Sequence, residues 1–221
     1  MLVAGIAGRE QSKTASLINS ILGQTGKKIS IVDSGNIVEW DNSRIRKYIG
    51  ELSLNKVDIL ILKINIWDIE KEIFNNIHFD IIIYTDKADD FKETDQKYGN
   101  LMRRVFSLLD EKGIAIVNVD DSELISFLQG MKHYFITYGF NSKASLTTSS
   151  IGESVFKDEF LCCLQRSIPT NNGMLVEPQE FRLNVQPEYM DPYSVLAAAA
   201  FAVVNGIDLN LLNNEGQKHI F

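Results

Sequence analysis

The sequence has 221 residues, of which 45% are hydrophobic and 23% are charged, as is typical of a globular protein. This composition excludes disordered, collagen-like and low-complexity chains. The 29 acidic and 22 basic residues give a net charge of -7, which argues against a nucleic-acid-binding protein, because binding to a phosphate backbone depends on Lys and Arg.

The chain shows no signal for secretion or for membrane insertion. Its first residues form an apolar strand that leads into a glycine-rich turn, without the basic segment of a signal peptide. The longest apolar run, residues 195–204, is about half as long as a bilayer span requires. The adjacent Cys162 and Cys163 have poor geometry for a disulfide, so we expect free thiols in a strand and a cytoplasmic protein.

The first 141 residues alternate short apolar runs with amphipathic segments, a pattern that is typical of strands and helices in an α/β protein. The predicted strands are 2–7, 29–32, 57–64, 79–84, 113–119 and 134–138. The predicted helices are 14–22, 42–54 and 101–109, with a short helix after Ser122. Nearly unbroken apolar strands indicate burial on both faces, so we predict an open, mostly parallel sheet with helices on both faces.

The pattern changes after Gly139. Residues 145–148, 154–166 and 180–185 predict antiparallel strands joined by polar turns. A helix follows over 192–205, with Asp191 as its N-cap and Pro192 in its first turn, and a last short helix covers 209–214. We therefore expect one domain, with a doubly wound core over 1–141 and an antiparallel appendage with C-terminal helices over 142–221.

The turn between the first strand and the first helix, from Gly5 to Thr14, has features of a phosphate-binding loop. Such a loop needs small residues, a lysine for the terminal phosphates and a hydroxyl for magnesium, and Lys13 and Thr14 supply the last two. Ser12 stands where a glycine is expected. Two interpretations remain open, namely a relaxed phosphate-binding loop at a helix N-terminus or a polar turn in which Ser12 is the N-cap.

Further segments follow in a characteristic order. They are HFDIIIYTD at 78–86, IVNVDD at 116–121, ITYG at 136–139, YSVLAA at 193–198 and GIDL at 206–209. Together with the first turn, they resemble the central ATP-binding domain of the Mur ligase family, and in particular its UDP-N-acetylmuramoyl-tripeptide synthetases. The corresponding family patterns are H-F-D-x-x-x-F-T-N, I-N-x-D-D, I-T-Y-G, Y-N-x-L-A-A and G-I-D-L, and the resemblance covers nearly the whole chain.

The resemblance implies a mostly parallel sheet with flanking helices and a small antiparallel sheet. It also implies a reaction in which ATP phosphorylates a carboxylate and an amine then attacks the acyl phosphate. Family members carry a substrate-binding domain before this one and a domain that helps to clamp ATP after it. We expect both of these domains to be absent from this chain.

The positions at which this chain differs from the family patterns are those that the family uses to bind phosphate and magnesium. Ser12 replaces the glycine before the lysine, and Lys63 stands where the family has its magnesium-binding Glu. Phe91 replaces a His, and Met102 replaces a modified Lys. The change at Lys63 reverses a charge next to the divalent cation, where repulsion costs several kcal/mol. As a set, these changes predict a site that no longer carries out the ligase reaction.

We therefore expect a non-catalytic relative that serves as a binding or regulatory module, with weak or absent ATP binding and no magnesium. No catalytic residue is assigned. The candidate phosphate-binding residues are Gly8, Gln11, Ser12, Lys13, Thr14 and Lys63, and the candidate metal ligands, if a metal binds, are Thr14 and Asp90. The expected partner is a second copy of the chain or a cell-wall-related ligase, without nucleic acid and without membrane insertion.

One alternative stays open, and Lys13 and Thr14 favour it. In this alternative the chain is an ATP-dependent acid–amino-acid ligase of the peptidoglycan-precursor type, or an ATPase, that works with separately encoded domains. The ammonium of Lys63 is expected to point toward the first turn. There it either takes the place of magnesium or pairs with Asp86 or Asp90 and closes the site.

Overall fold

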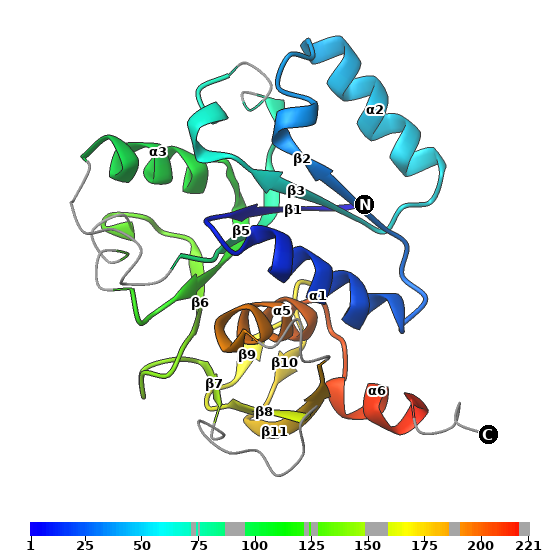
Figure 1. The fold of residues 1–221 in the computed structure, drawn as a ribbon, viewed down its shortest axis with the longest axis vertical. Helices are drawn as coiled ribbons and strands as arrows, with labels where there is room; N and C mark the ends of the chain where they lie inside the picture. Colours follow the sequence, from blue (N-terminus) through cyan, green and yellow to red (C-terminus); the bar gives the residue numbers. More distant parts are fainter. Residues whose placement is uncertain are drawn as a thin grey trace.

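The computed structural model describes residues 1–71, 74, 76–86, 96–121, 124, 128–148, 159–185 and 191–216 (Figure 1). The main sheet contains β1 (Leu2–Ala7), β2 (Ile29–Asp33), β3 (Ile59–Ile64), β4 (Phe79–Tyr84), β5 (Leu109–Asn118), β6 (Tyr134–Tyr138), β7 (Leu146–Thr148), β8 (Glu159–Leu164) and β11 (Gln179–Asn184), and a small sheet contains β9 (Ile168–Pro169) and β10 (Leu175–Val176). The helices are α1 (Gln11–Gly23), α2 (Asn42–Leu54), α3 (Gln96–Phe106), α5 (Pro192–Val204) and α6 (Leu209–Gly216), with single 3-10 turns at η1 (Ser34–Asn36) and η2 (Ile66–Asp68).

The strand order of the main sheet is β11-β8-β7-β6-β5-β4-β1-β3-β2. Strands β1 to β7 pair in parallel, whereas β8 runs antiparallel to β7 and β11 runs antiparallel to β8. The mostly parallel sheet and the small antiparallel sheet are as predicted. The antiparallel strands β8 and β11, however, continue the main sheet, and only β9 and β10 form a sheet of their own.

Helices cover both faces of the sheet, and two hydrophobic clusters lie beneath them. One cluster joins α1 and α5 to one face, and the other joins α2, α3 and η2 to the opposite face. Helices α1 and α5 lie side by side (Figure 1). All residues of α5 from Ser194 to Val204 are buried, as expected for a helix that is apolar on every side.

Local sequence signals determine many of the element ends. The predicted bounds of β1, α2, β4 and β6 agree with the structure. Two N-caps are formed by aspartate side chains: Asp41 accepts a hydrogen bond from the N–H of Arg44, and Asp191 accepts one from the N–H of Ser194. The cysteines lie in β8 as expected, and both are free.

Several predicted elements have different bounds in the structure, and two differences stand out. Helix α1 begins at Gln11 instead of Thr14, about one turn earlier. Helix α3 ends at Phe106, and Leu109 already belongs to β5, where the pairing with β4 shifts register between Phe79 and Ile81. The segment 109–112 therefore starts the strand instead of ending the helix, because pairing with β4 outweighs the local helical pattern.

Candidate functional site

The turn between β1 and α1 is short and begins with a glycine. Gly8 has a φ of 115°, a conformation that residues with a side chain rarely adopt. Helix α1 then begins at Gln11, and its N-cap residue, Glu10, makes no capping hydrogen bond through its side chain. Lys13 lies in the first turn of α1, as the phosphate-loop interpretation predicts. The alternative in which Ser12 is the N-cap is wrong.

The first turn of α1 presents positive charge. The first backbone hydrogen bond of the helix runs from the N–H of Thr14 to the carbonyl of Glu10, at 3.0 Å. The N–H groups of residues 11–13 therefore have no acceptor inside the helix, and together with the helix dipole they favour an anion. The Nζ atom of Lys13 lies 3.4 Å from Glu10 Oε2, and about half of the Lys13 side chain is exposed.

Two side-chain oxygens of this turn are buried without a hydrogen-bond partner among the described residues. They are Gln11 Oε1 and Thr14 Oγ1. Thr14 is fully buried. An unsatisfied buried polar atom costs about 1–3 kcal/mol, so a ligand or a water molecule that satisfied these atoms would gain that energy. The Thr14 hydroxyl can donate a hydrogen bond to a phosphate oxygen, or its oxygen can coordinate a metal ion.

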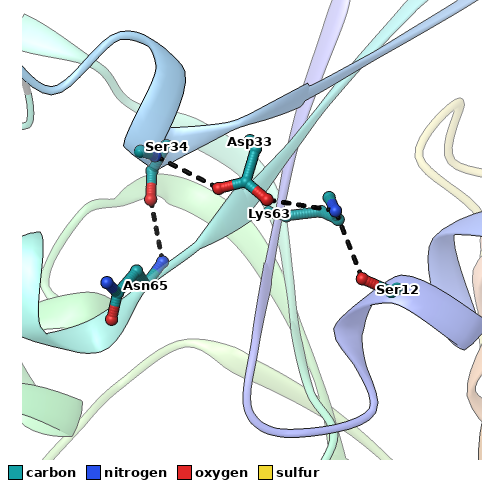
Figure 2. Close-up of polar contacts among 6 residues, drawn as sticks. Ser12, Asp33, Ser34, Lys63 and Asn65 are labelled. Carbon is teal, nitrogen blue, oxygen red and sulfur yellow. Dashed lines mark hydrogen bonds and ion pairs between the residues drawn. The ribbon is translucent and has the colours of Figure 1, made fainter.

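Lys63 reaches the first turn of α1 from the end of β3. Its Nζ atom lies 3.1 Å from Asp33 Oδ2 and donates to Ser12 Oγ at 3.2 Å (Figure 2). Asp33 is held in turn by the N–H of Gly35, which donates to Asp33 Oδ1 at 3.1 Å. Lys63 thus points toward the turn as predicted. Among the described residues its carboxylate partner is Asp33 and not Asp86, and Asp90 lies outside the described residues.

The sheet register explains this arrangement. Asp33 on β2 and Ile6 on β1 both lie beside Lys63 on β3. Side chains alternate between the faces of a strand, and Ile59 and Ile61 belong to the cluster beneath α1. Lys63 continues their face at the strand end, so its stem follows the core and its ammonium emerges beside the start of α1.

On the β4 side of β1, the carboxylate of Asp86 accepts a hydrogen bond from the backbone of the turn. The N–H of Arg9 donates to Asp86 Oδ1 at 2.6 Å. A Cβ atom on Gly8 would lie 2.6 Å from Thr85 Oγ1 and 2.8 Å from Asp86 Oδ1. Only glycine therefore allows this close approach. Asp86 is fully buried and also accepts a hydrogen bond from the hydroxyl of Tyr98 on α3.

Asp86 belongs to a buried network at the carboxyl ends of β4, β5 and β6. The Tyr84 hydroxyl donates to Asp121 Oδ2 at 2.6 Å, and the Tyr138 hydroxyl donates to the Tyr84 carbonyl at 2.7 Å. Asn118 Nδ2 donates to the Asp86 carbonyl at 3.0 Å. Burial, and to a lesser extent the nearby aspartates, raises the pKa of Tyr84 and Tyr138 well above the ordinary value. Burial and Asp86 do the same to the pKa of Tyr98.

The remaining residues that the sequence singled out lie elsewhere. Met102 is fully buried in the cluster beneath α3. His78 lies 3.8 Å from Asp110 in an exposed pair, and His133 Nδ1 is buried without a partner among the described residues. Asp90, Phe91, His219 and the short helix expected after Ser122 fall at least partly outside the described residues.

Sequence reasoning missed Asp33, and it missed the contact between Asp86 and Arg9. Asp33 ends a strand at the edge where all parallel strands of the sheet end, and ligands of α/β sheets bind at that edge. That rule places Asp33 at the same edge as Lys63, but their contact depends on the register between β2 and β3. No local signal indicates that the Asp86 carboxylate turns back to the loop after β1, because the two residues belong to different strand ends.

The residues present fit a phosphate group better than a divalent cation. The helix start, Lys13 and Lys63 all bring positive charge to one place. The described residues contain no group of three or more His, Cys, Asp or Glu side chains that could share a metal ion. Asp33 is already paired with Lys63, and Asp86 is already engaged by Arg9 and Tyr98. Thr14 is the one candidate metal ligand that the described residues retain.

Comparisons with known proteins give a consistent result. The family profile of the Mur ligase middle domain matches residues 12–171. The UDP-N-acetylmuramoyl-L-alanyl-D-glutamate–2,6-diaminopimelate ligase of Chlamydia abortus is 22% identical over 175 residues, which cover 72% of this chain and 36% of that protein. The chain therefore spans about a third of the length of this relative.

Solved structures show the same fold. A structure of a UDP-N-acetylmuramoyl-L-alanyl-D-glutamate–2,6-diaminopimelate ligase superposes with a TM-score of 0.72 at 14% identity, covering 99% of this chain and 46% of the other. Escherichia coli FolC in complex with DHPP and ADP superposes with a TM-score of 0.55 at 14% identity, covering 94% of this chain and 54% of the other. In the part of the chain that the structure describes, no helix is long and apolar enough to cross a membrane.

Proposed function

The chain belongs to the Mur ligase family through its middle domain, and from this premise we propose that it is a non-catalytic member that serves as a binding or regulatory module. The observation that carries the proposal is the closed turn after β1. Its Arg9 N–H donates to the buried carboxylate of Asp86 at 2.6 Å. A backbone amide that is used in this way does not donate to a phosphate oxygen, and the carboxylate beneath it repels one.

Lys63 supports the same proposal. In the resemblance it occupies the position of the magnesium-binding Glu, and its ammonium lies between Asp33 and Ser12. A cation at this position does not coordinate a metal ion and repels a divalent one. We propose that the module works in the cytoplasm, with a second copy of the chain or a cell-wall-related ligase as its partner, and that it binds nucleotide weakly or not at all.

A second function is favoured by a specific observation. Lys13 lies in the first turn of α1, and the buried Thr14 hydroxyl has no hydrogen-bond partner among the described residues. In the family's phosphate-binding loop, a lysine for the terminal phosphates is likewise followed by a hydroxyl residue for magnesium. The alternative is therefore an ATP-dependent acid–amino-acid ligase, or an ATPase, that works with separately encoded domains.

Phosphate release from ATP tests whether the chain is non-catalytic by itself. The purified chain is incubated with ATP and magnesium, with and without muramoyl precursors, beside a Lys13→Ala variant. We expect the same background rate for both proteins. Turnover in the unmodified chain that disappears in Lys13→Ala would reject the non-catalytic proposal and support the ligase or ATPase.

A further inference from the structure

The polar side chains at the strand ends differ in exposure on the two sides of β1, and those at the ends of β2 and β3 are accessible to solvent. There Lys63 holds both Asp33 and Ser12, and 21% of its side chain and 46% of that of Asp33 are exposed. We propose that Lys63, Ser12 and the first turn of α1 form a magnesium-independent site for a polyphosphate, in which Asp33 competes with the ligand for Lys63. This inference rests on the proposed function, because it takes the metal chemistry to be lost.

Lys63 has the capacity to bind such a ligand. An ammonium group has three N–H donors, and Asp33 and Ser12 engage two of them. No other described residue accepts the third donor, which can therefore bind an incoming oxygen. The aliphatic part of the Lys63 side chain lies along the core face of β3, which holds the ammonium near the start of α1.

The neighbouring turn adds further donors of the same kind. The backbone N–H groups of residues 11–13 lack acceptors inside the helix, and the helix dipole favours negative charge there. Thr14, which is fully buried, has a hydroxyl without a partner among the described residues. A hydroxyl, the amides of the first turn, Lys63 and Lys13, which is paired with Glu10 in the absence of ligand, match the several oxygens of a polyphosphate better than they match a single carboxylate.

Asp33 acts as the competitor. The N–H of Gly35 donates to its carboxylate at 3.1 Å and holds it in place, so Asp33 and an incoming oxygen compete for the same ammonium. Figure 2 shows the ammonium between the carboxylate and the Ser12 hydroxyl. When a phosphate oxygen takes over the ammonium, the pair with Asp33 weakens. Removal of the Asp33 charge should therefore tighten binding.

Isothermal titration calorimetry measures the affinity of the intact chain for tripolyphosphate, once in EDTA and once in magnesium. We expect the affinity in EDTA to equal or exceed that in magnesium, and to fall steeply with ionic strength. Asp33→Asn should tighten binding by about two- to fivefold, and Lys63→Met should weaken it by about tenfold. Lys63→Glu should bind only when magnesium is present.

Two control variants make the result specific. Lys47→Met removes the same charge from an exposed pair on α2, where Lys47 Nζ lies 3.9 Å from Glu51 Oε1, and should leave the affinity unchanged. Lys63→Arg keeps the charge and should retain most of the binding. If Lys63→Met does not fold, as judged by its melting temperature, the Asp33→Asn and Lys63→Arg proteins carry the test.

The outcomes separate this inference from the proposed function. Binding that requires magnesium in the unmodified chain, no binding of tripolyphosphate in either buffer, or equal affinities for the unmodified chain, Asp33→Asn and Lys63→Met would each overturn the polyphosphate site. None of these results alone shows catalysis. The non-catalytic proposal fails only if the chain turns over ATP in a manner that depends on Lys13.

Discussion

Two groups of polar side chains lie at the same edge of the sheet and differ in their exposure to solvent. On the side of β4 to β6, Asp86 and Tyr84 are fully buried, and Asp86 satisfies the Arg9 amide. On the side of β2 and β3, Asp33 and Lys63 form an ion pair that solvent can reach. The first group fixes the turn after β1, whereas the second can exchange its partner for a ligand.

The difference shows that polarity at a strand end does not by itself indicate a binding site. A buried hydrogen-bonded carboxylate is expensive to disturb, because its partners would be left unsatisfied. An exposed ion pair contributes little to stability and is easily replaced. The two groups should therefore respond very differently to mutation and to pH.

Alkaline pH should produce the largest effect, and it should act on the buried group. The pKa values of Tyr84, Tyr98 and Tyr138 are raised in the folded protein, so their stabilisation is complete below about pH 10 and is lost as the pH rises above that value. Each buried tyrosine lowers the free energy of unfolding by about 1.4 kcal/mol per pH unit, or about 4 kcal/mol for all three at pH 11.

Urea unfolding between pH 8 and pH 11 measures this loss. Tyr98→Phe should reduce the slope above pH 10 by about a third, because two of the three tyrosines remain. A free energy of unfolding that stays constant up to pH 11 would show that this network does not hold its phenols in the neutral form.

Asp86→Ala should produce the next largest effect. It removes the acceptor of the Arg9 N–H and of the Tyr98 hydroxyl, and we expect a loss of about 2–4 kcal/mol. The matched variant in the exposed group, Asp33→Ala, should cost less than about 1 kcal/mol. Urea denaturation of both variants at pH 7 compares them, and similar losses would remove the distinction between the two groups.

Gly8→Ala should destabilise the protein by about 1–3 kcal/mol. The cause is the positive φ of Gly8 and the 2.6 Å approach of the new Cβ atom to Thr85 Oγ1. Gly50→Ala is the control, because a Cβ atom at Gly50 on α2 meets nothing within 4 Å. That variant should stabilise the helix by about 0.5–1 kcal/mol. Thermal melts distinguish the two, and a neutral Gly8→Ala would indicate that the turn relaxes away from Asp86.

The smallest effect on stability is expected for Lys63→Met. Its ion pair with Asp33 is partly exposed, and such pairs contribute about 0–1 kcal/mol. Denaturation at low and high salt should therefore give nearly the same free energy of unfolding for the variant and the unmodified chain. A loss above about 2 kcal/mol would assign Lys63 a structural role instead of a binding role.

Local patterns made much of the fold predictable. Apolar runs defined β1, β4 and β6, and the Asp191 cap with Pro192 defined the start of α5. The start of α1 was missed because Glu10 supplies no side-chain cap that the sequence could reveal. The joining of β8 and β11 to the main sheet was missed because strand pairing between distant segments is not a local property.

The candidate site was predictable only in part. Spacing placed Lys13 at the start of a helix, and the resemblance placed Lys63 beside it. The partner of Lys63 depends on the register between β2 and β3, in which Asp33 lies beside Lys63. The closure of the turn by Asp86 depends on the position of β4 next to β1. Neither relation can be read from the order of residues in one sequence.

The melting temperature of the unmodified chain in the presence of ATP tests the central claim most directly. A ligand at a hundred times its dissociation constant adds about 2.7 kcal/mol of stability, which corresponds to a rise of roughly 5–10 °C for a chain of this size. We predict that any rise in melting temperature that ATP produces is at least as large in EDTA as in magnesium and shrinks with salt. A rise that occurs only when magnesium is present would contradict the claim that Lys63 has replaced the metal.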